Sequence, residues 1–377
     1  MKKFFKKITD LLKYIFSFKF FRVCSIIFAI NIILILIFSN KGISSWYVNN
    51  VYPLIVGSYG RIVSFIPFSL LEIIYLLGII FGCVLFVSLI IFCFKHKSDN
   101  YKKYMKIMAK VSTIALLSAL CLNTIIFEPI KNTSSITFAK EKREYTTLEI
   151  KKLRDYLFSK TEELHDKIDR DENGTPMYLY DMDKTAIEAL HNIEDEFPKL
   201  KGYYPKAKPL VSSRLFTFFQ ILGITEFTLM SVNYNKDTSV TFLPNTLTHE
   251  YAHIKGYVKE DEANFIAYLS CIKSDDVFFQ YSGYLSVIYY VDNDYHVSSK
   301  ENYVKYSLPE VCYKDADAFS SEAYEALKKN EEISQVLGDI SSTVTDNTIK
   351  INGDESGIAS YSYVVSLLLN YYDGILF

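Results

Sequence analysis

Long apolar runs fill the first third of the chain, whereas apolar and polar positions alternate in the rest. The runs cover residues 23–38, 73–94 and 111–127. With its flanking residues, each run reaches the roughly 20 residues that a helix needs to cross a bilayer. The pattern predicts a membrane region over residues 1–130, with transmembrane helices near residues 21–39, 71–94 and 107–127.

Basic residues indicate the orientation of these helices. Lysines are frequent in the N-terminal arm and between the second and third runs, whereas the segment between the first two runs has only Lys41 and Arg61. Because cytoplasmic loops are enriched in Lys and Arg, we expect a cytoplasmic N-terminus and an extracellular location for everything after residue 127. No small-x-small cleavage site follows the first run, so we interpret it as an uncleaved anchor and not as a signal peptide. Residues 4–20 mix lysines with aromatic residues, which is typical of a segment along the membrane surface.

The second part of the chain has the pattern of a folded domain. A polar linker at residues 131–145 precedes a domain over residues 146–377. From Thr146 onward, apolar residues recur at spacings near 3.6, which predicts a helix, and a second helix is expected at residues 183–196. The run at residues 361–369 is too short and too polar for a fourth span, so we expect a helix that packs on the domain core.

A short β-hairpin is expected inside this helical domain. Residues 228–234 and 238–242 are rich in β-branched and aromatic residues, and they flank Asn235-Lys236-Asp237. This pattern is typical of two paired strands. The predicted fold class is therefore an α-helical membrane region followed by a mostly helical α+β domain with a small sheet.

Composition limits the partners of this chain. Its 377 residues carry a net charge of -2 and are half hydrophobic. Membrane lipid is therefore an expected partner, and nucleic acid is not, because no strongly basic surface is implied. Cys271 and Cys312 are the two cysteines of the predicted domain. Whether they form a disulfide or remain two buried thiols is left open by the sequence.

The strongest chemical signal is the H-E-x-x-H motif at residues 249–253. Positions i and i+4 of a helix share a face, so His249 and His253 can bind one metal ion together. Glu250 projects beside them, where a carboxylate can accept a proton from a water that the metal activates. Pro244 before the motif and Gly256 after it favour a short helix. The arrangement is typical of hydrolytic zinc sites.

A third metal ligand is expected from the acidic run Glu260-Asp261-Glu262, which opens the next apolar stretch. Glu260 shares a helix face with Asn264 and with small residues, which favours a close approach to the motif helix. Asn264 is then expected to hold one histidine in its tautomer. Glu262 is the alternative third ligand, although its helix face otherwise carries ordinary core residues.

Beyond the motif, the chain resembles a family of bacterial multi-span membrane proteins assigned to the zincin-like metallopeptidase clan, of the gluzincin type. The similar segments are Lys208-Pro209, Ser213-Arg214, 223–225, 248–253, Gly256, 260–265 and Ser360-Tyr361. The H-E-x-x-H and E-x-E-A-N-F pieces are the most specific of these, whereas Glu226-Phe227-Thr228 stands where a Pro-Phe-containing stretch is expected. The resemblance implies a zincin-like domain with zinc at His249 and His253, a glutamate ligand from the following helix, and Glu250 as the base.

These observations favour a membrane-anchored zinc metallopeptidase that acts on peptide or protein substrates. Tyr361 is the expected oxyanion-stabilising residue because the resemblance extends to it, and His296 is the alternative. A non-enzymatic sensor or assembly module with a structural or vestigial metal site is the second hypothesis, but such a site has no need of a base like Glu250. A transporter ranks last because the spans lack paired charges.

Overall fold

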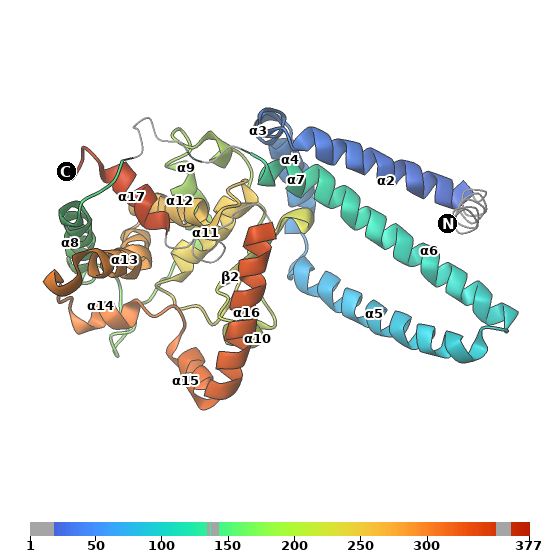
Figure 1. Ribbon diagram of the computed structural model, residues 1–377. Coiled ribbons are helices and arrows are strands. Elements are labelled where there is room, and N and C mark those ends of the chain that lie inside the picture. The colour runs from blue at the N-terminus through green and yellow to red at the C-terminus, as the bar shows by residue number, and fades with distance from the viewer. Residues whose placement is uncertain (1–18, 134–135, 137–142, 352–362) are drawn as a thin grey trace. The chain divides into compact units, whose positions relative to one another are not determined.

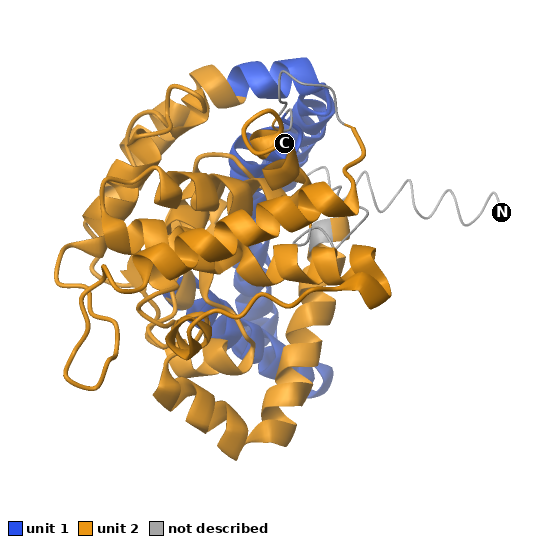
Figure 2. Cartoon of the chain, turned by 90° about the vertical axis from the view of Figure 1, so that its left-hand side faces the viewer, with its two compact units in different colours: residues 1–47, 73–134 blue, residues 48–72, 135–377 orange. Residues whose placement is uncertain are grey.

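The computed structural model describes residues 19–133, 136, 143–351 and 363–377, and these are mostly helical (Figure 1). The chain divides into two compact units, residues 1–47 with 73–134 and residues 48–72 with 135–377 (Figure 2). The pattern of apolar runs predicted a membrane region over all of residues 1–130. In the structure, residues 48–72 belong instead to the second unit, together with the predicted domain.

Within the described part of the chain, three helices are long and apolar enough to cross a membrane, as predicted. They are Lys19–Phe38 (α2), Leu70–Lys95 (α5) and Asp99–Lys131. The third comprises α6 (Asp99–Leu122), a π-helical turn (Asn123–Phe127) and α7 (Glu128–Lys131), so it begins earlier than expected. These helices support an association with the membrane. The segment predicted to lie along the membrane surface falls almost entirely outside the described residues.

The segment between the first two spans is helical and contributes to the core of the second unit. It forms α3 (Lys41–Asn50) and α4 (Tyr52–Ser64). α4 buries Tyr52, Val56, Gly60 and Val63, which recur at spacings of three and four and therefore share one face. The helix makes a close contact at Gly60, where an added Cβ would lie 2.9 Å from Pro205 Cγ.

Helices build most of the second unit. Besides α4 they are α8 (Thr147–Leu164), α9 (Met182–His191), α10 (Ser213–Phe218), α11 (Leu243–Ile254), α12 (Glu260–Ile272), α13 (Val277–Ser299), α14 (Glu310–Asp315), α15 (Ser321–Lys329), α16 (Glu331–Ile351) and α17 (Val364–Tyr372). The first two helices predicted for this unit are both present. α8 begins with a capping box between Thr146 and Glu149. α9 ends at His191, before the predicted boundary, because residues 192–197 form turns that lead to a 3-10 helix beginning at Pro198.

The core of the second unit is formed where α11, α12 and α13 pack against one another (Figure 1). Tyr251, Phe265, Tyr268 and Tyr281 are fully buried there. α12 and α13 approach each other closely at Gly283, where an added Cβ would lie 2.7 Å from Cys271 Cβ. Cys271 and Cys312 are both buried free thiols, and burial raises the pKa of Cys271 to about 12.

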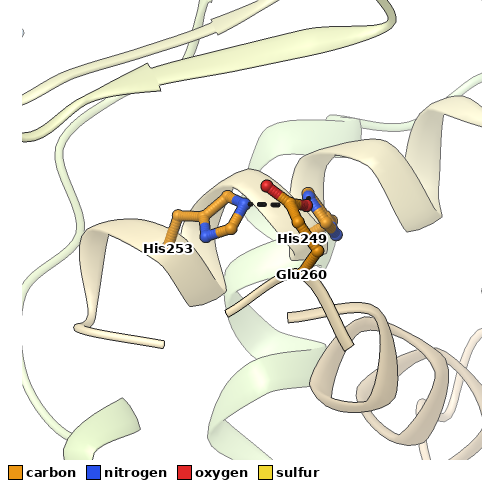
Figure 3. A group of neighbouring side chains, drawn as sticks. All are labelled: His249, His253 and Glu260. Atoms are coloured by element: carbon orange, nitrogen blue, oxygen red, sulfur yellow. Dashed lines mark ion pairs between the residues drawn. The ribbon is translucent and has the colours of Figure 1, made fainter. Parts of the chain in front are cut away.

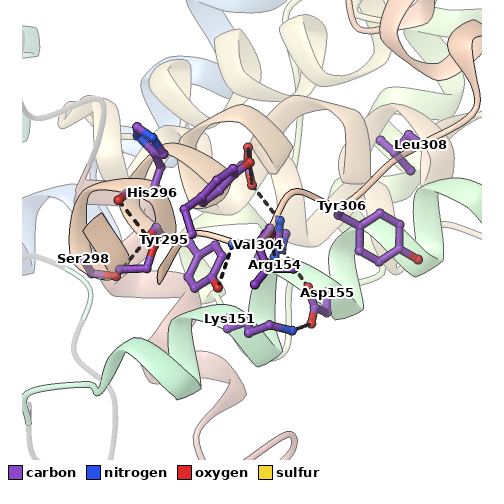
Figure 4. Close-up of polar contacts among 12 residues, drawn as sticks. Lys151, Arg154, Asp155, Tyr295, His296, Ser298, Val304, Tyr306 and Leu308 are labelled. Atoms are coloured by element: carbon purple, nitrogen blue, oxygen red, sulfur yellow. Dashed lines mark hydrogen bonds and ion pairs between the residues drawn. The ribbon is translucent and has the colours of Figure 1, made fainter. Parts of the chain in front are cut away.

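A buried arginine links α8 to α13. Arg154 is 1% exposed, and its guanidinium donates to Asp292 at 2.9 Å and to the carbonyl oxygen of Val304 at 2.8 Å (Figure 4). Asp155 accepts a further hydrogen bond from Arg154 Nε at 2.7 Å. The ring of Tyr295 lies 4.5 Å from the guanidinium carbon. Because a buried charge is costly unless it is paired, this network holds α8 against α13 in one orientation.

The sheet differs from the predicted hairpin. Among the described residues it has three strands in the order β1-β3-β2. β2 (Gly223–Glu226) pairs antiparallel with β3 (Ser231–Tyr234), and β1 (Lys208–Pro209) pairs parallel with β3. The first predicted strand is thus partly confirmed, but the second, at residues 238–242, is wrong. That segment forms only an isolated bridge from Thr238 to Phe319, because its neighbour is a distant part of the chain.

Candidate metal centre

The motif lies on α11, as predicted, and the following turn brings α12 beside it. Pro244 stands in the first turn of α11, and Gly256 follows its end with φ 97°, a left-handed conformation that suits glycine. His253 Nδ1 lies 2.7 Å from the carbonyl oxygen of Tyr257. Since a carbonyl oxygen only accepts, Nδ1 carries the proton of a neutral His253, and Nε2 is left free to bind a metal.

Glu260, in the first turn of α12, lies between the two motif histidines (Figure 3). Its Oε2 is 3.3 Å from His249 Nε2 and 3.5 Å from His253 Nε2. Ligands about 2.0–2.1 Å from a tetrahedral zinc ion are themselves about 3.3–3.4 Å apart. The Glu260 oxygen is therefore spaced from each histidine nitrogen as two ligands of one zinc ion would be. Among the described residues, this is the one group of at least three His, Cys, Asp or Glu side chains that could hold a metal ion. Its three ligand atoms all lie within 4.8 Å of one another.

The electrostatics of this group also suit a cation. Burial opposes a charge on either residue, but the charge of His253 holds the pKa of Glu260 well below its usual range. Burial likewise opposes protonation of His253, yet Glu260 raises the pKa of His253 to about 9. Glu260 Oε2 is buried and accepts no hydrogen bond from the described residues. Its contacts are the two ion pairs with the histidines, and a divalent cation bound here would be coordinated by the same oxygen.

Glu250 is positioned by the edge of the sheet. Its side chain is 5% exposed, and Oε2 accepts a hydrogen bond from Thr225 Oγ1 in β2 at 2.7 Å. Burial raises the pKa of Glu250, against the charges of His249 and His253. β2 passes so close that a Cβ on Gly223 would lie 2.6 Å from Glu250 Oε1. A carboxylate that can exchange protons is therefore held beside the candidate metal ligands.

The structure does not bring the other predicted site residues to the histidines. Glu262 Oε1 accepts a hydrogen bond from the backbone of Ile136 at 3.2 Å, and Glu262 is not part of the ligand group. Asn264 Nδ2 is buried without a hydrogen-bond partner among the described residues. The carbonyl of Tyr257, and not Asn264, lies beside Nδ1 of His253.

Neither predicted oxyanion-stabilising residue is placed at the histidines. Tyr361 lies outside the described residues. His296 lies on α13, where its ring packs edge-on against Tyr303 with centroids 4.7 Å apart. Tyr290, also on α13, was not predicted. Burial raises the pKa of Tyr290, and the charge of Glu260 raises it further. No sequence signal distinguishes it among 30 tyrosines.

A family model described as a protein of unknown function, DUF3810, matches residues 47–369. The chain belongs to the DUF3810 family. The part shared with this family begins after α2 and contains α4, the sheet, the motif helix and all three candidate ligands. No curated protein and no solved structure shows a significant match to the chain.

Gly223 gives a first prediction for this site of the DUF3810 chain. An alanine there would place a methyl group 2.6–2.9 Å from three atoms of the Glu250 side chain. We expect Gly223→Ala to displace Glu250 while leaving the bound-metal content unchanged, because the three candidate ligands lie on α11 and α12. Metal analysis of purified Gly223→Ala, together with peptide hydrolysis, tests this. Unchanged metal content together with unchanged activity would contradict the placement of Glu250.

Proposed function

We propose that the chain is a membrane-anchored, zinc-dependent metallopeptidase with a zincin-like domain of the gluzincin type. The observation that carries the proposal is the group of His249, His253 and Glu260, in which the Glu260 oxygen lies 3.3 and 3.5 Å from the two histidine nitrogens, close to the separation of ligands in a tetrahedral zinc site. Glu250 adds a second argument, because a purely structural metal site has no use for a buried carboxylate next to it. The sensor or assembly module remains the alternative, and it predicts metal without hydrolysis.

Each residue has a distinct role in this proposal. Zinc bound to the three ligands would act as a Lewis acid that activates a water molecule and polarises the carbonyl group of the scissile bond. Glu250 accepts the proton of the attacking water and passes it to the leaving amine. Thr225 holds the Glu250 carboxylate in place through its hydroxyl group. A phenol supplied by Tyr361 or Tyr290 would stabilise the developing oxyanion.

The sheet suggests how a substrate chain binds. In the order β1-β3-β2, β2 is an edge strand, and its residue Thr225 contacts Glu250. An edge strand presents backbone groups that can pair with an extended peptide. A substrate added to β2 would therefore lie beside the proposed base. This supports an extended segment of a peptide or protein as the substrate.

The proposal is tested on the full chain in lipid nanodiscs. We expect about one zinc per chain by elemental analysis and cleavage within a library of quenched fluorescent peptides. Replacing His249 and His253 together by alanine should remove both properties, whereas His191→Ala, at the C-terminal end of α9, should change neither. Full zinc occupancy in the double variant would refute the site. Zinc without cleavage of any peptide would favour the non-enzymatic alternative.

The proposed orientation places the metal centre outside the cell. Lysines cluster around the junction of α5 and α6, at residues 95–106, and we assign this junction to the cytoplasm. Protease added to wall-free intact cells should therefore degrade the unit that contains α8–α17 and leave this junction intact. Mass spectrometry of the protected fragments measures both. Cleavage confined to the junction would reverse the orientation.

A further inference from the structure

Four large apolar side chains of the second unit are exposed near the start of α5. Phe65 is 87% exposed and Phe68 is 47% exposed, both in the short segment between α4 and α5. Val211 is 76% exposed and Leu215 is 51% exposed, in and just before α10. We call these four residues the apolar rim. Large exposed apolar surfaces commonly mark sites of interaction.

Hydrogen bonds within the second unit join the two halves of the rim. The carboxylate of Glu72 accepts from the backbone N–H groups of Val211 at 2.9 Å and Ser212 at 2.8 Å. Lys208 Nζ donates to the carbonyl oxygen of Ser64 at 3.1 Å and also to that of Ile66. The segment before α5 and the segment before α10 are therefore held side by side.

The position of Glu72 indicates what covers the rim. Glu72 lies in the first turn of α5, and no charged residue occurs between it and Lys95 in the last turn. The intervening helix is roughly 33 Å long at 1.5 Å per residue, close to the roughly 30 Å of a hydrocarbon core. Glu72 and Lys95 thus fall at the two boundaries of the hydrocarbon. The interfacial layer then contains residues 65–68, which come just before α5. It also contains Val211, whose backbone is hydrogen-bonded to Glu72.

We propose that the apolar rim is embedded in the lipid interface. Its occupant is the same bilayer that α5 crosses, and the apolar side chains enter it between the headgroups. Glu72 makes this arrangement possible, because its carboxylate satisfies two backbone donors that would otherwise be unpaired at the edge of the membrane.

The rim also sets the height of the metal centre above the bilayer. Tyr52 begins α4, and its hydroxyl donates to the carbonyl oxygen of Ile254 at the end of the motif helix, at 2.7 Å. The thirteen residues of α4 span about 20 Å before the chain reaches Phe65. The end of the motif helix therefore lies within about 25 Å of the interface. An extended polypeptide covers that distance in roughly 7 or 8 residues.

This height points to a substrate class. We infer that the substrates are polypeptides tethered to the same membrane, cut within roughly 7 or 8 residues of their anchor, at ~3.3 Å per extended residue. This second step rests on the proposed peptidase function, whereas the lipid contact of the rim does not.

The lipid contact is tested with single-tryptophan variants of the full chain. The sequence has one tryptophan, Trp46, so Trp46→Phe provides a background without that fluorophore. In that background we would introduce Phe65→Trp, Val211→Trp or Leu215→Trp, and compare nanodiscs of plain and brominated phosphatidylcholine. The control is Val297→Trp, because Val297 is a similarly exposed valine (65%) on α13.

We expect brominated lipid to quench the fluorescence of the three rim tryptophans and to leave that of Val297→Trp unchanged. Because these side chains are exposed, the substitutions should not disturb folding. If one variant fails to fold, the other two still report on the rim. Absence of quenching at the rim would overturn the proposal and leave the surface to a protein partner. Equal quenching at position 297 would overturn it too, since the rim would then contact lipid no more than another exposed surface of the second unit does.

A matched pair of substrates tests the second step. The same cleavable peptide is presented either free in solution or joined to a lipid anchor through eight residues. We expect Phe65→Ser combined with Val211→Ser to slow cleavage of the anchored peptide and to leave cleavage of the free peptide unchanged. Equal slowing of both would overturn the inferred substrate class. If neither peptide is cut by the wild-type chain, the peptidase function fails while the quenching result stands.

Discussion

Replacing Glu250 by glutamine is expected to abolish peptide hydrolysis while zinc remains bound. The substitution keeps the size of the side chain and the acceptor for the hydroxyl group of Thr225, but it removes the group that accepts a proton. Loss of a general base typically costs about 10²–10⁴-fold in rate. The measurement is hydrolysis of the peptide found in the library screen, alongside the zinc content of the same preparation.

Glu262→Gln is a matched control for this variant. Glu262 is also 5% exposed and is also a carboxylate whose pKa is raised by burial, but it lies outside the ligand group. We expect it to retain most of its activity. If Glu250→Gln kept full activity, the hydrolytic role proposed for Glu250 would be wrong. If it lost its zinc, the defect would be structural and would say nothing about the base.

Local patterns were sufficient for the features that depend on neighbouring residues. Long apolar runs predicted the three candidate spans, because length and hydropathy alone decide whether a helix can cross a bilayer. The placement of the motif on one short helix followed from Pro244 and Gly256. The choice of Glu260 over Glu262 as the metal ligand rested on which helix face carries small residues. The structure places Glu260 Oε2 at 3.3 and 3.5 Å from the histidine nitrogens, and metal binding itself stays a prediction.

Features that depend on distant partners were beyond such patterns. The segment at residues 238–242 has strand-like residues, yet Ser239 hydrogen-bonds to Ala318, nearly eighty positions away. The strand that pairs with β3 is instead β2, which begins with glycine because a side chain there would collide with Glu250. Gly223 therefore weakened the strand signal for a reason that only the tertiary structure reveals.

The connector at residues 48–72 shows the same limit. Glycine is a poor helix former, yet Gly60 lies in a regular helix and allows close contact with Pro205. The buried hydroxyl of Tyr52 reaches the end of the motif helix. A fragment that starts after the last span would lack this support, so the experiments above use the full chain.

Zinc affinity is expected to separate Glu260 from Glu262. Glu260→Gln replaces the carboxylate oxygen that lies 3.3 Å from His249 Nε2 and 3.5 Å from His253 Nε2 by a neutral amide. Because zinc prefers anionic oxygen, we expect a loss larger than the roughly 10–100-fold that changes outside the ligand shell usually cause. Glu262→Gln should stay close to wild type, since the hydrogen bond of Glu262 is to the backbone of Ile136.

Competition with a fluorescent zinc chelator measures both variants on the same scale. The pair is well matched, because both glutamates lie in the first turn of α12 and both substitutions preserve shape. Equal affinity of Glu260→Gln and wild type, with a loss in Glu262→Gln, would transfer the ligand role to Glu262 and require α12 to rotate relative to α11. Equal losses in both would indicate that the acidic first turn attracts zinc only through its overall charge. A loss confined to Glu260→Gln is the result expected if Glu260 coordinates the ion directly.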